Sequence, residues 1–265
     1  MSTSCQEANV DLEDKVAIIT GAGEDVGIAA ARRFLVEGAM LVLSGTNAGA
    51  LDALKLERSW LGRRVIPIAA EAGISTAIDE AIAAHGRIDI LVNAAGLDEG
   101  RAWSDTDQAE WDRQVAAGPT RVFEWCRSVS PHMKKRKQGK IVNVAWSAGR
   151  YRSGYFPTSS SFRSGVAYAS GQGAVLALTR ELAFELAADG IYVNSVAPGL
   201  IGTRHAQEEW DRLSEKDRSY ILAESALGRL GTPDELAAVI CFLASERSSY
   251  VTGTSIDVNG GWWMS

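Results

Sequence analysis

A glycine-rich turn near the start of the chain carries the clearest chemistry in this sequence. It reads Thr20-Gly-Ala-Gly-Glu-Asp-Val-Gly27 and lies between a short apolar run and a stretch with helical periodicity. The backbone N–H groups of such a turn, with the positive end of the next helix, can hold a diphosphate. Gly21, Gly23 and Gly27 would let the backbone approach that ligand closely. Alone the motif is a weak signal, because a plain turn uses the same residues.

An acidic residue stands inside this turn. Asp25 directly precedes Val26, where the sequence predicts that the helix begins. A carboxylate at a helix N-terminus is a good N-cap, and there it would compete with a diphosphate or repel it. Two interpretations stay open: Asp25 caps the helix, or Asp25 belongs to a ligand site.

The elements that must position this turn alternate along the chain. Helical periodicity predicts helices at 26–37, 74–84, 107–137 and 166–188. Strands separated by such helices run parallel with right-handed crossovers, so we predict an α/β fold with a doubly wound parallel sheet. Ligands would bind at the carboxyl ends of its strands. Apolar runs predict about seven strands, at 16–20, 40–44, 65–69, 88–92, 141–145, 191–196 and 255–258.

Composition excludes several classes of protein. The 265 residues are 46% hydrophobic and 23% charged, which is typical of a globular protein. A net charge of −6 argues against non-specific binding of nucleic acid. The longest strongly apolar stretch, 236–244, is about half of the roughly 18 residues that span a membrane. We expect a flexible tail at 1–12 and a single domain at 13–265.

Cysteines and histidines form no recognisable site. Cys5, Cys126 and Cys241 show no CxxC spacing, so neither a disulfide framework nor a zinc site is predicted. The three histidines are scattered among unrelated segments, which predicts no metal site. With no signal for secretion in the first residues, we expect a cytoplasmic protein.

Further motifs follow the predicted strands in a fixed order. Asn93-Ala-Ala-Gly96 follows the fourth strand, and Asn194-Ser-Val-Ala-Pro-Gly199 with Thr203 follows the sixth. Together with the glycine turn and the segments 86–93, 111–112, 228–233, 250–253 and 257–261, these motifs resemble the short-chain dehydrogenase/reductase family. The resemblance runs from about Lys15 to Trp263.

The resemblance implies a Rossmann-type fold that interconverts alcohols and carbonyls with NAD or NADP. It also implies a homotetramer or homodimer acting on a small-molecule substrate. The segment 44–47 offers neither an acid for a ribose hydroxyl nor an arginine for a 2′-phosphate, so the sequence does not separate NAD from NADP. The implied cofactor residues are Gly21, Gly23, Asp25, Val26 and Gly27 in the turn, Asn93, Ala94 and Gly96 on the adenosine side, and Pro198, Gly199, Ile201 and Thr203 around the nicotinamide.

The chain departs from the family pattern at several implied site positions. Asp25 stands where the family has the middle glycine of its turn. The family's catalytic set is asparagine, serine, tyrosine and lysine, in which the tyrosine transfers a proton and the lysine lowers its pKa. The matching positions here hold Gly118, Trp146, Tyr168 and Gln172.

These departures change the expected chemistry. Gln172 can still hydrogen-bond a ribose hydroxyl, but it supplies no positive charge, so we expect Tyr168 to keep a pKa of about 10. A neutral phenol can donate a proton when a carbonyl is reduced, and is a poor base for alcohol oxidation. Acid–base help is worth about 10²- to 10⁴-fold, so we expect slow or direction-biased catalysis. Ser147 replaces the missing serine only if the strand end bulges, because neighbours on a strand point to opposite faces.

Two segments are expected around the substrate. An inserted loop at 150–164 should lie over the cleft and bring Ser159, Ser160, Ser161 or Ser164 near it. Its arginines, at 150, 152 and 163, could attract an anionic substrate. The segment 204–226, with Trp210, Leu213 and Ile221, is amphipathic and is expected to act as a lid.

Three functions therefore remain open from the sequence. The first is a divergent NAD(P)-linked oxidoreductase with Tyr168 as proton donor. The second is a non-redox enzyme on the same fold, of lyase, isomerase or dehalogenase type. The third is a catalytically silent protein that binds a ligand or a partner subunit, because a fold survives the loss of its catalytic groups.

Overall fold

The computed structural model describes residues 11–57, 65–95, 101–147 and 165–264. Its centre is one sheet of seven parallel strands in the order β3-β2-β1-β4-β5-β6-β7. The alternation of strands and helices therefore folds as predicted. The strands are β1 (Val16–Thr20), β2 (Met40–Gly45), β3 (Val65–Ala69), β4 (Ile90–Asn93), β5 (Gly139–Val144), β6 (Ile191–Pro198) and β7 (Ser255–Val258).

The strand order reverses between β1 and β4, which lie side by side. There Thr20 pairs with Asn93, and Asn93 pairs in turn with Asn143 of β5. The carboxyl ends of these three strands therefore lie level with one another. In a doubly wound sheet this reversal point is where ligands bind.

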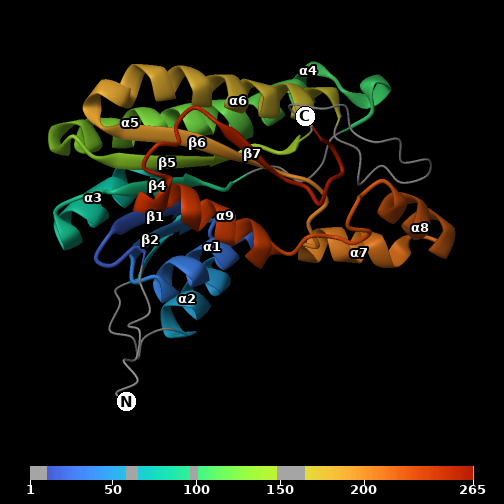
Figure 1. Ribbon diagram of the computed structural model, residues 1–265, viewed down its shortest axis with the longest axis horizontal. Helices are drawn as coiled ribbons and strands as arrows, with labels where there is room; N and C mark the ends of the chain where they lie inside the picture. Colours follow the sequence, from blue (N-terminus) through green and yellow to red (C-terminus); the bar gives the residue numbers. More distant parts are fainter. Residues whose placement is uncertain (1–10, 58–64, 96–100, 148–164, 265) are drawn as a thin grey trace, which may run out of the picture.

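Helices cover both faces of the sheet (Figure 1). Ile19 of β1 packs in a core with α1, α2 and α9, whereas its neighbour Ile18 packs in a second core with α3, α5 and α6. This alternation along β1 is the period of two that a strand buried on both faces requires. The helices are α1 (Asp25–Val36), α2 (Ala48–Glu57), α3 (Gly73–His85), α4 (Gln108–Val115), α5 (Arg121–Arg136), α6 (Val166–Leu186), α7 (Arg204–Arg212), α8 (Glu215–Ala223) and α9 (Pro233–Ala244).

Two helical regions differ from the prediction. α2 was not predicted, because its ten residues contribute only two described core side chains, Leu51 and Leu54. The helix expected at 107–137 is interrupted by a π-helical turn at Ala116–Thr120. This turn contains Pro119, which has no N–H group for the regular helical hydrogen bond.

The expected tail ends earlier than predicted. Leu12 is fully buried in the core beside α1, and its N–H donates to the carbonyl oxygen of Glu37 at 2.9 Å. The Asp11 N–H donates to a carboxylate oxygen of Glu37. The ordered fold therefore includes Asp11 and Leu12, and the rest of the predicted tail lies outside the described residues. Within the described part of the chain, no helix combines the length and apolar character needed to cross a membrane.

Candidate functional site

The glycine turn after β1 is packed too closely for side chains. Gly21 has φ +65°, and a Cβ placed there would lie 2.6 Å from the backbone nitrogen of Ala95. A Cβ on Gly27 would overlap the carbonyl oxygen of Gly21, and one on Gly23 would lie 2.8 Å from Cβ of Asn47. The turn therefore lets α1 begin close to the ends of β2 and β4, as a dinucleotide turn requires.

The end of β4 is tied to this turn through Thr20. The Thr20 hydroxyl accepts from the N–H groups of Ala94 and Ala95, at 3.2 and 3.4 Å. The backbone of Ala94 is thus fixed beside the turn. Gly96, expected on the adenosine side of a cofactor, lies outside the described residues.

The side chain of Asn93 lies inside the protein rather than in a ligand site. Asn93 is 2% exposed, and its Nδ2 donates to Oδ1 of Asn143 at 2.8 Å. Nδ2 of Asn143 then donates to the hydroxyl of Thr179 on α6 at 2.9 Å. This buried chain of hydrogen bonds joins β4, β5 and α6. The side chain thus positions the strands that carry the site, and the expected cofactor contact of Asn93 stays a prediction for its backbone.

Asp25 does not cap the helix that it begins. α1 starts at Asp25 itself, its N-cap residue is Glu24, and no side chain caps it. The Asp25 carboxylate accepts from the backbone N–H of Arg204 at 2.6 Å and from Nε of Arg204 at 3.2 Å. The predicted helix cap is therefore wrong, because the carboxylate turns away from α1 toward the start of α7.

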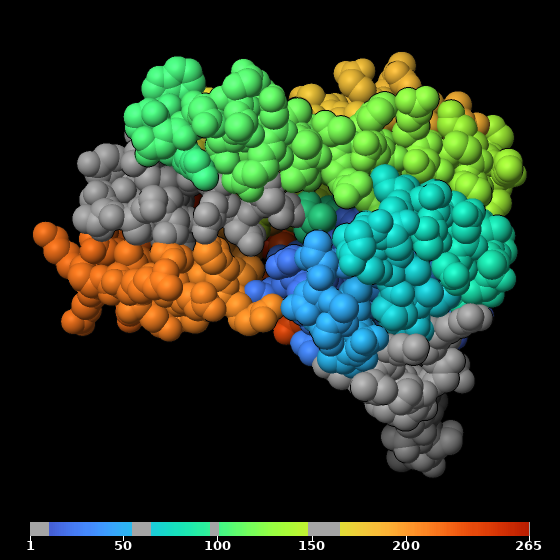
Figure 2. Space-filling model, turned by 180° about the vertical axis from the view of Figure 1, so that it is seen from behind, coloured from blue at the N-terminus to red at the C-terminus, as the bar shows by residue number. Residues whose placement is uncertain are grey.

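The first residues of α7 complete this arrangement. Thr203, expected near the nicotinamide, is the N-cap of α7, and its hydroxyl accepts from the Ala206 N–H at 3.2 Å. The predicted lid at 204–226 consists of α7, α8 and their connections. Figure 2 shows this segment in orange, extending from one end of the molecule.

A cleft of about 220 Å³ lies between the turn and α7. The glycine turn, the ends of β4 and β5, and the lid all contribute to it. The structure thus brings together segments that the sequence placed at the same edge of the sheet. The lining residues are Glu24, Asp25, Val26, Ala94, Val144, Trp146, Thr203, Arg204, His205 and Glu208.

Gln172 is occupied by a structural hydrogen bond. Its side chain is buried on α6, and Oε1 accepts from the backbone N–H of Trp146 at 3.0 Å. Tyr168 lies one helical turn earlier on α6 and is half-buried. The amide of Gln172 therefore holds the end of β5 against the helix that carries Tyr168.

Gly118 lies beside the same helix. It is buried in the π-helical turn, and a Cβ added to it would meet no atom within 4 Å. The neighbouring Pro119 packs against α6, where a Cβ on Gly171 would lie 3.3 Å from Cδ of Pro119. Gly118 and Trp146 thus lie beside the section of α6 that carries Gln172, and Gly118 leaves room where a side chain would stand.

Ser147 and Trp146 point in different directions at the end of β5. The Ser147 hydroxyl is buried and donates to the carbonyl oxygen of Pro198 at 2.5 Å, with that of Ala197 at 3.3 Å. Its single hydrogen therefore links β5 to β6. Trp146 lines the cleft instead. This geometry gives Ser147 a positioning role rather than the catalytic role that we considered.

The segment after β6 is also tightly packed. The N–H of Gly199 donates to the carbonyl oxygen of Val258 at 3.1 Å, and a Cβ on Gly199 would lie 2.7 Å from Cβ of Asn259. Ile201 is 3% exposed and forms an isolated bridge with Gly231. These contacts fix the path of the chain from β6 to α7.

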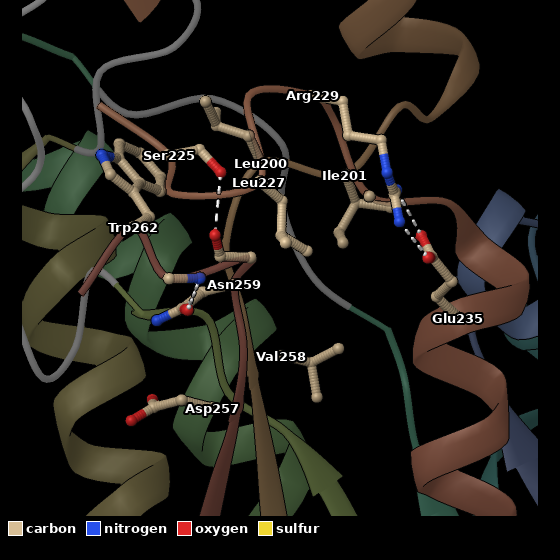
Figure 3. Close-up of a pocket in the computed structure, with 13 residues that line it drawn as sticks. Leu200, Ile201, Ser225, Leu227, Arg229, Glu235, Asp257, Val258, Asn259 and Trp262 are labelled. Carbon is tan, nitrogen blue, oxygen red and sulfur yellow. Dashed lines mark hydrogen bonds and ion pairs between the residues drawn. The ribbon is translucent and has the colours of Figure 1, made fainter. Parts of the chain in front are cut away.

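A second cavity of about 230 Å³ is lined in part by this segment (Figure 3). Leu200, Ile201 and Val258 contribute its apolar side chains. At its rim, both guanidinium NH groups of Arg229 contact the Glu235 carboxylate, at 2.9 and 2.6 Å. The hydrogen bonds from Arg229 lower the pKa of Glu235 to about 2. Glu235 lies in the first turn of α9. Neither Arg229 nor Glu235 lines the cleft between the glycine turn and α7.

Two other expectations concern metal ligands and the inserted loop. Among the described residues, no group of three or more histidine, cysteine or acidic side chains could hold a metal ion. The inserted loop at 150–164, with its serines and arginines, lies outside the described residues.

Comparison with known proteins places the chain in a family. Residues 21–263 match the family model described as enoyl-(acyl carrier protein) reductase. The chain is 37% identical over 254 residues to the (2S)-[(R)-hydroxy(phenyl)methyl]succinyl-CoA dehydrogenase subunit BbsD of Thauera aromatica, covering 94% of this chain and 97% of that protein. It is 36% identical over 254 residues to the 3-oxoacyl-[acyl-carrier-protein] reductase FabG of Thermotoga maritima, covering 94% and 98%.

Solved structures agree with this assignment. A 7α-hydroxysteroid dehydrogenase complexed with NADH and 7-oxo glycochenodeoxycholic acid superposes with a TM-score of 0.84 at 31% identity, over 96% of each chain. The fold is that of Rossmann-type oxidoreductases. The chain belongs to the short-chain dehydrogenase/reductase family.

Proposed function

We propose that this chain takes part in NAD(P)-linked hydride transfer between an alcohol and a carbonyl, with Tyr168 as the proton donor during carbonyl reduction. The observation that carries the proposal is the open N-terminus of α1. The side chain of its N-cap residue, Glu24, makes no capping hydrogen bond, and the glycine turn brings the helix start to the ends of β1 and β4. Unpaired N–H groups at a helix N-terminus are suited to a diphosphate.

The residues in and near the cleft would have the following roles. The nicotinamide, when bound, supplies the hydride. The first turn of α1 would hold the diphosphate, and Tyr168 would donate its phenolic proton to the carbonyl oxygen. Gln172 keeps the end of β5 in place through the Trp146 N–H, and brings no cation to the phenol. We therefore expect reduction to be favoured over oxidation, because a phenol without a neighbouring cation is a poor base.

The names of the relatives suggest a class of substrate. A 3-oxoacyl-[acyl-carrier-protein] and a succinyl-CoA both carry their acyl group as a thioester. We propose that an acyl thioester with an oxygen substituent is the substrate of this chain also. Such a substrate is anionic through its carrier, which agrees with the arginines of the segment 150–164.

Activity toward a simple 3-oxoacyl thioester tests this proposal. Acetoacetyl-CoA would be incubated with NADH or NADPH, and cofactor oxidation followed by absorbance. We expect slow reduction that is lost in Tyr168→Phe, while Tyr250→Phe, at an exposed tyrosine outside the predicted lid, keeps the wild-type rate. Equal rates in wild type and Tyr168→Phe would refute the role of Tyr168.

A second candidate is a catalytically silent subunit of an oxidoreductase. Two observations favour it. Asp25 is paired with Arg204 beside the diphosphate position, and Oε1 of Gln172 accepts a hydrogen bond from the Trp146 backbone. The relative from Thauera aromatica is itself named as a subunit of a dehydrogenase. If the chain is silent, Tyr168→Phe leaves the activity of its assembly unchanged. Light scattering of the purified chain tests the expected homodimer or homotetramer.

A further inference from the structure

The contact between Asp25 and Arg204 joins parts of the chain that are far apart in sequence. Two hydrogen bonds connect the carboxylate to residue 204, one to its backbone and one to its guanidinium. The Asp25 side chain is 23% exposed and that of Arg204 is 67% exposed. Asp25 is thus the more enclosed partner, and the contact lies at the wall of the cleft.

The Asp25 carboxylate lies where it can accept a hydrogen bond from the first residue of α7. Arg204 is the first residue of that helix, where N–H groups lack partners within the helix. The Asp25 carboxylate pairs with one such N–H group, while the Thr203 hydroxyl pairs with that of Ala206. A negative charge is stabilised at this end of a helix by the helix dipole.

The described part of α7 buries little surface. None of its described side chains is buried, and α8 contributes Ile221 alone as a buried residue among its described side chains. A segment with little buried apolar surface opens at low free-energy cost. The two hydrogen bonds from Asp25 tie this segment to the first turn of α1.

The backbone at position 25 does not require glycine. Among the described non-glycine residues, only Asp14 and Lys137 have positive φ, and Asp25 is helical. What the aspartate changes is therefore the side chain that occupies the cleft. Its carboxylate lies beside the uncapped N-terminus of α1, where a diphosphate would bind.

We propose that Asp25 and Arg204 form a latch that holds α7 over the cleft, and that this latch sets the affinity of the chain for a dinucleotide. The latch must release, or its charge must be removed, before a phosphate can reach the N-terminus of α1. This inference rests on the proposed function for its ligand, and on the contact alone for the position of α7.

Hydrogen exchange without nucleotide tests the latch itself. Asp25→Asn keeps the size of the side chain and removes its charge, and Asp25→Ala removes both acceptor atoms. We expect amide exchange in 204–212 to become about ten-fold faster in Asp25→Ala and to rise less in Asp25→Asn, because charge-assisted hydrogen bonds are lost. Glu208→Gln removes a carboxylate from the same cleft but not from the latch, and should leave exchange unchanged.

A titration of the same variants with NADH tests the effect on affinity. We expect Asp25→Asn and Asp25→Ala to bind NADH about ten-fold more tightly than the wild type, since a carboxylate next to the diphosphate is removed. Unchanged exchange of α7 in both Asp25 variants would overturn the latch. Faster exchange without tighter binding would overturn its role in affinity. If no variant binds NADH, the proposed function fails, and the exchange result still decides the latch.

Discussion

Replacing Gln172 tests whether this residue is a structural acceptor. In Gln172→Met the side chain keeps its length but loses the Oε1 that accepts from the Trp146 N–H at 3.0 Å. An N–H group left without a partner in a largely buried place costs about 1–3 kcal/mol. Trp146 is half-buried, so we expect the lower part of this range, about 1–2 kcal/mol. For a domain of this size that lowers Tm by about 2–4 °C.

Gln172→Lys separates this account from a simpler one. If Gln172 merely stands in for a lost lysine, restoring the lysine should be harmless. A lysine amine has donors and no acceptor, so it cannot pair with the Trp146 N–H, and we expect a loss of Tm at least as large as in Gln172→Met. Differential scanning calorimetry at a fixed protein concentration measures both values. Gln108→Met, an exposed glutamine of α4 that bonds Asp112, is the control and should unfold like the wild type. A wild-type Tm in both Gln172 variants would refute the reasoning.

Three further outcomes follow from packing and burial. Gly27→Ala should abolish the native circular dichroism spectrum, because its Cβ would overlap the Gly21 carbonyl oxygen. Gly118→Ala should change the free energy of unfolding by less than about 1 kcal/mol, because its Cβ meets no atom within 4 Å. Asn143→Leu should lower the free energy of unfolding in urea by about 2–4 kcal/mol, because buried amide and hydroxyl partners lose their bonds; a smaller effect than in Gly118→Ala would contradict the network. Burial raises the pKa of Cys126 to about 12, so at pH 8 iodoacetamide should label it in urea and not in the native protein, as peptide mass spectrometry would show.

The sequence predicts the sheet well because the strands between its two edges are almost entirely buried, whereas the edge strands β3 and β7 are partly exposed. Buried strands are short apolar runs that turn residues bound, and all seven strands are found. Helix α2 is not predicted because its hydrophobic periodicity is short and weak. The π-helical turn is not predicted either. A proline within a helical pattern indicates that the helix bends or ends there, but the pattern does not say which of the two occurs.

The candidate site is predicted less completely, and the reason is distance along the chain. The period of two does not decide where Trp146 and Ser147 point, because β5 ends at Val144. No local pattern indicates that the Asp25 carboxylate binds residue 204, because the two are 179 positions apart. The same holds for the hydrogen bond between Gln172 and the Trp146 backbone. Of the two interpretations of Asp25, the structure excludes the cap of α1, because the N-cap residue is Glu24 and the Asp25 carboxylate bonds residue 204.

Binding of the cofactor is the direct test of hydride transfer by this chain. Isothermal titration calorimetry of the wild-type protein with NADH and with NADPH, at concentrations up to millimolar, measures it without assuming a substrate. The open N-terminus of α1 predicts saturable binding of at least one of the two, weakened by the carboxylate of Asp25. The absence of any binding heat for both cofactors at millimolar concentration would contradict the account and favour a silent subunit.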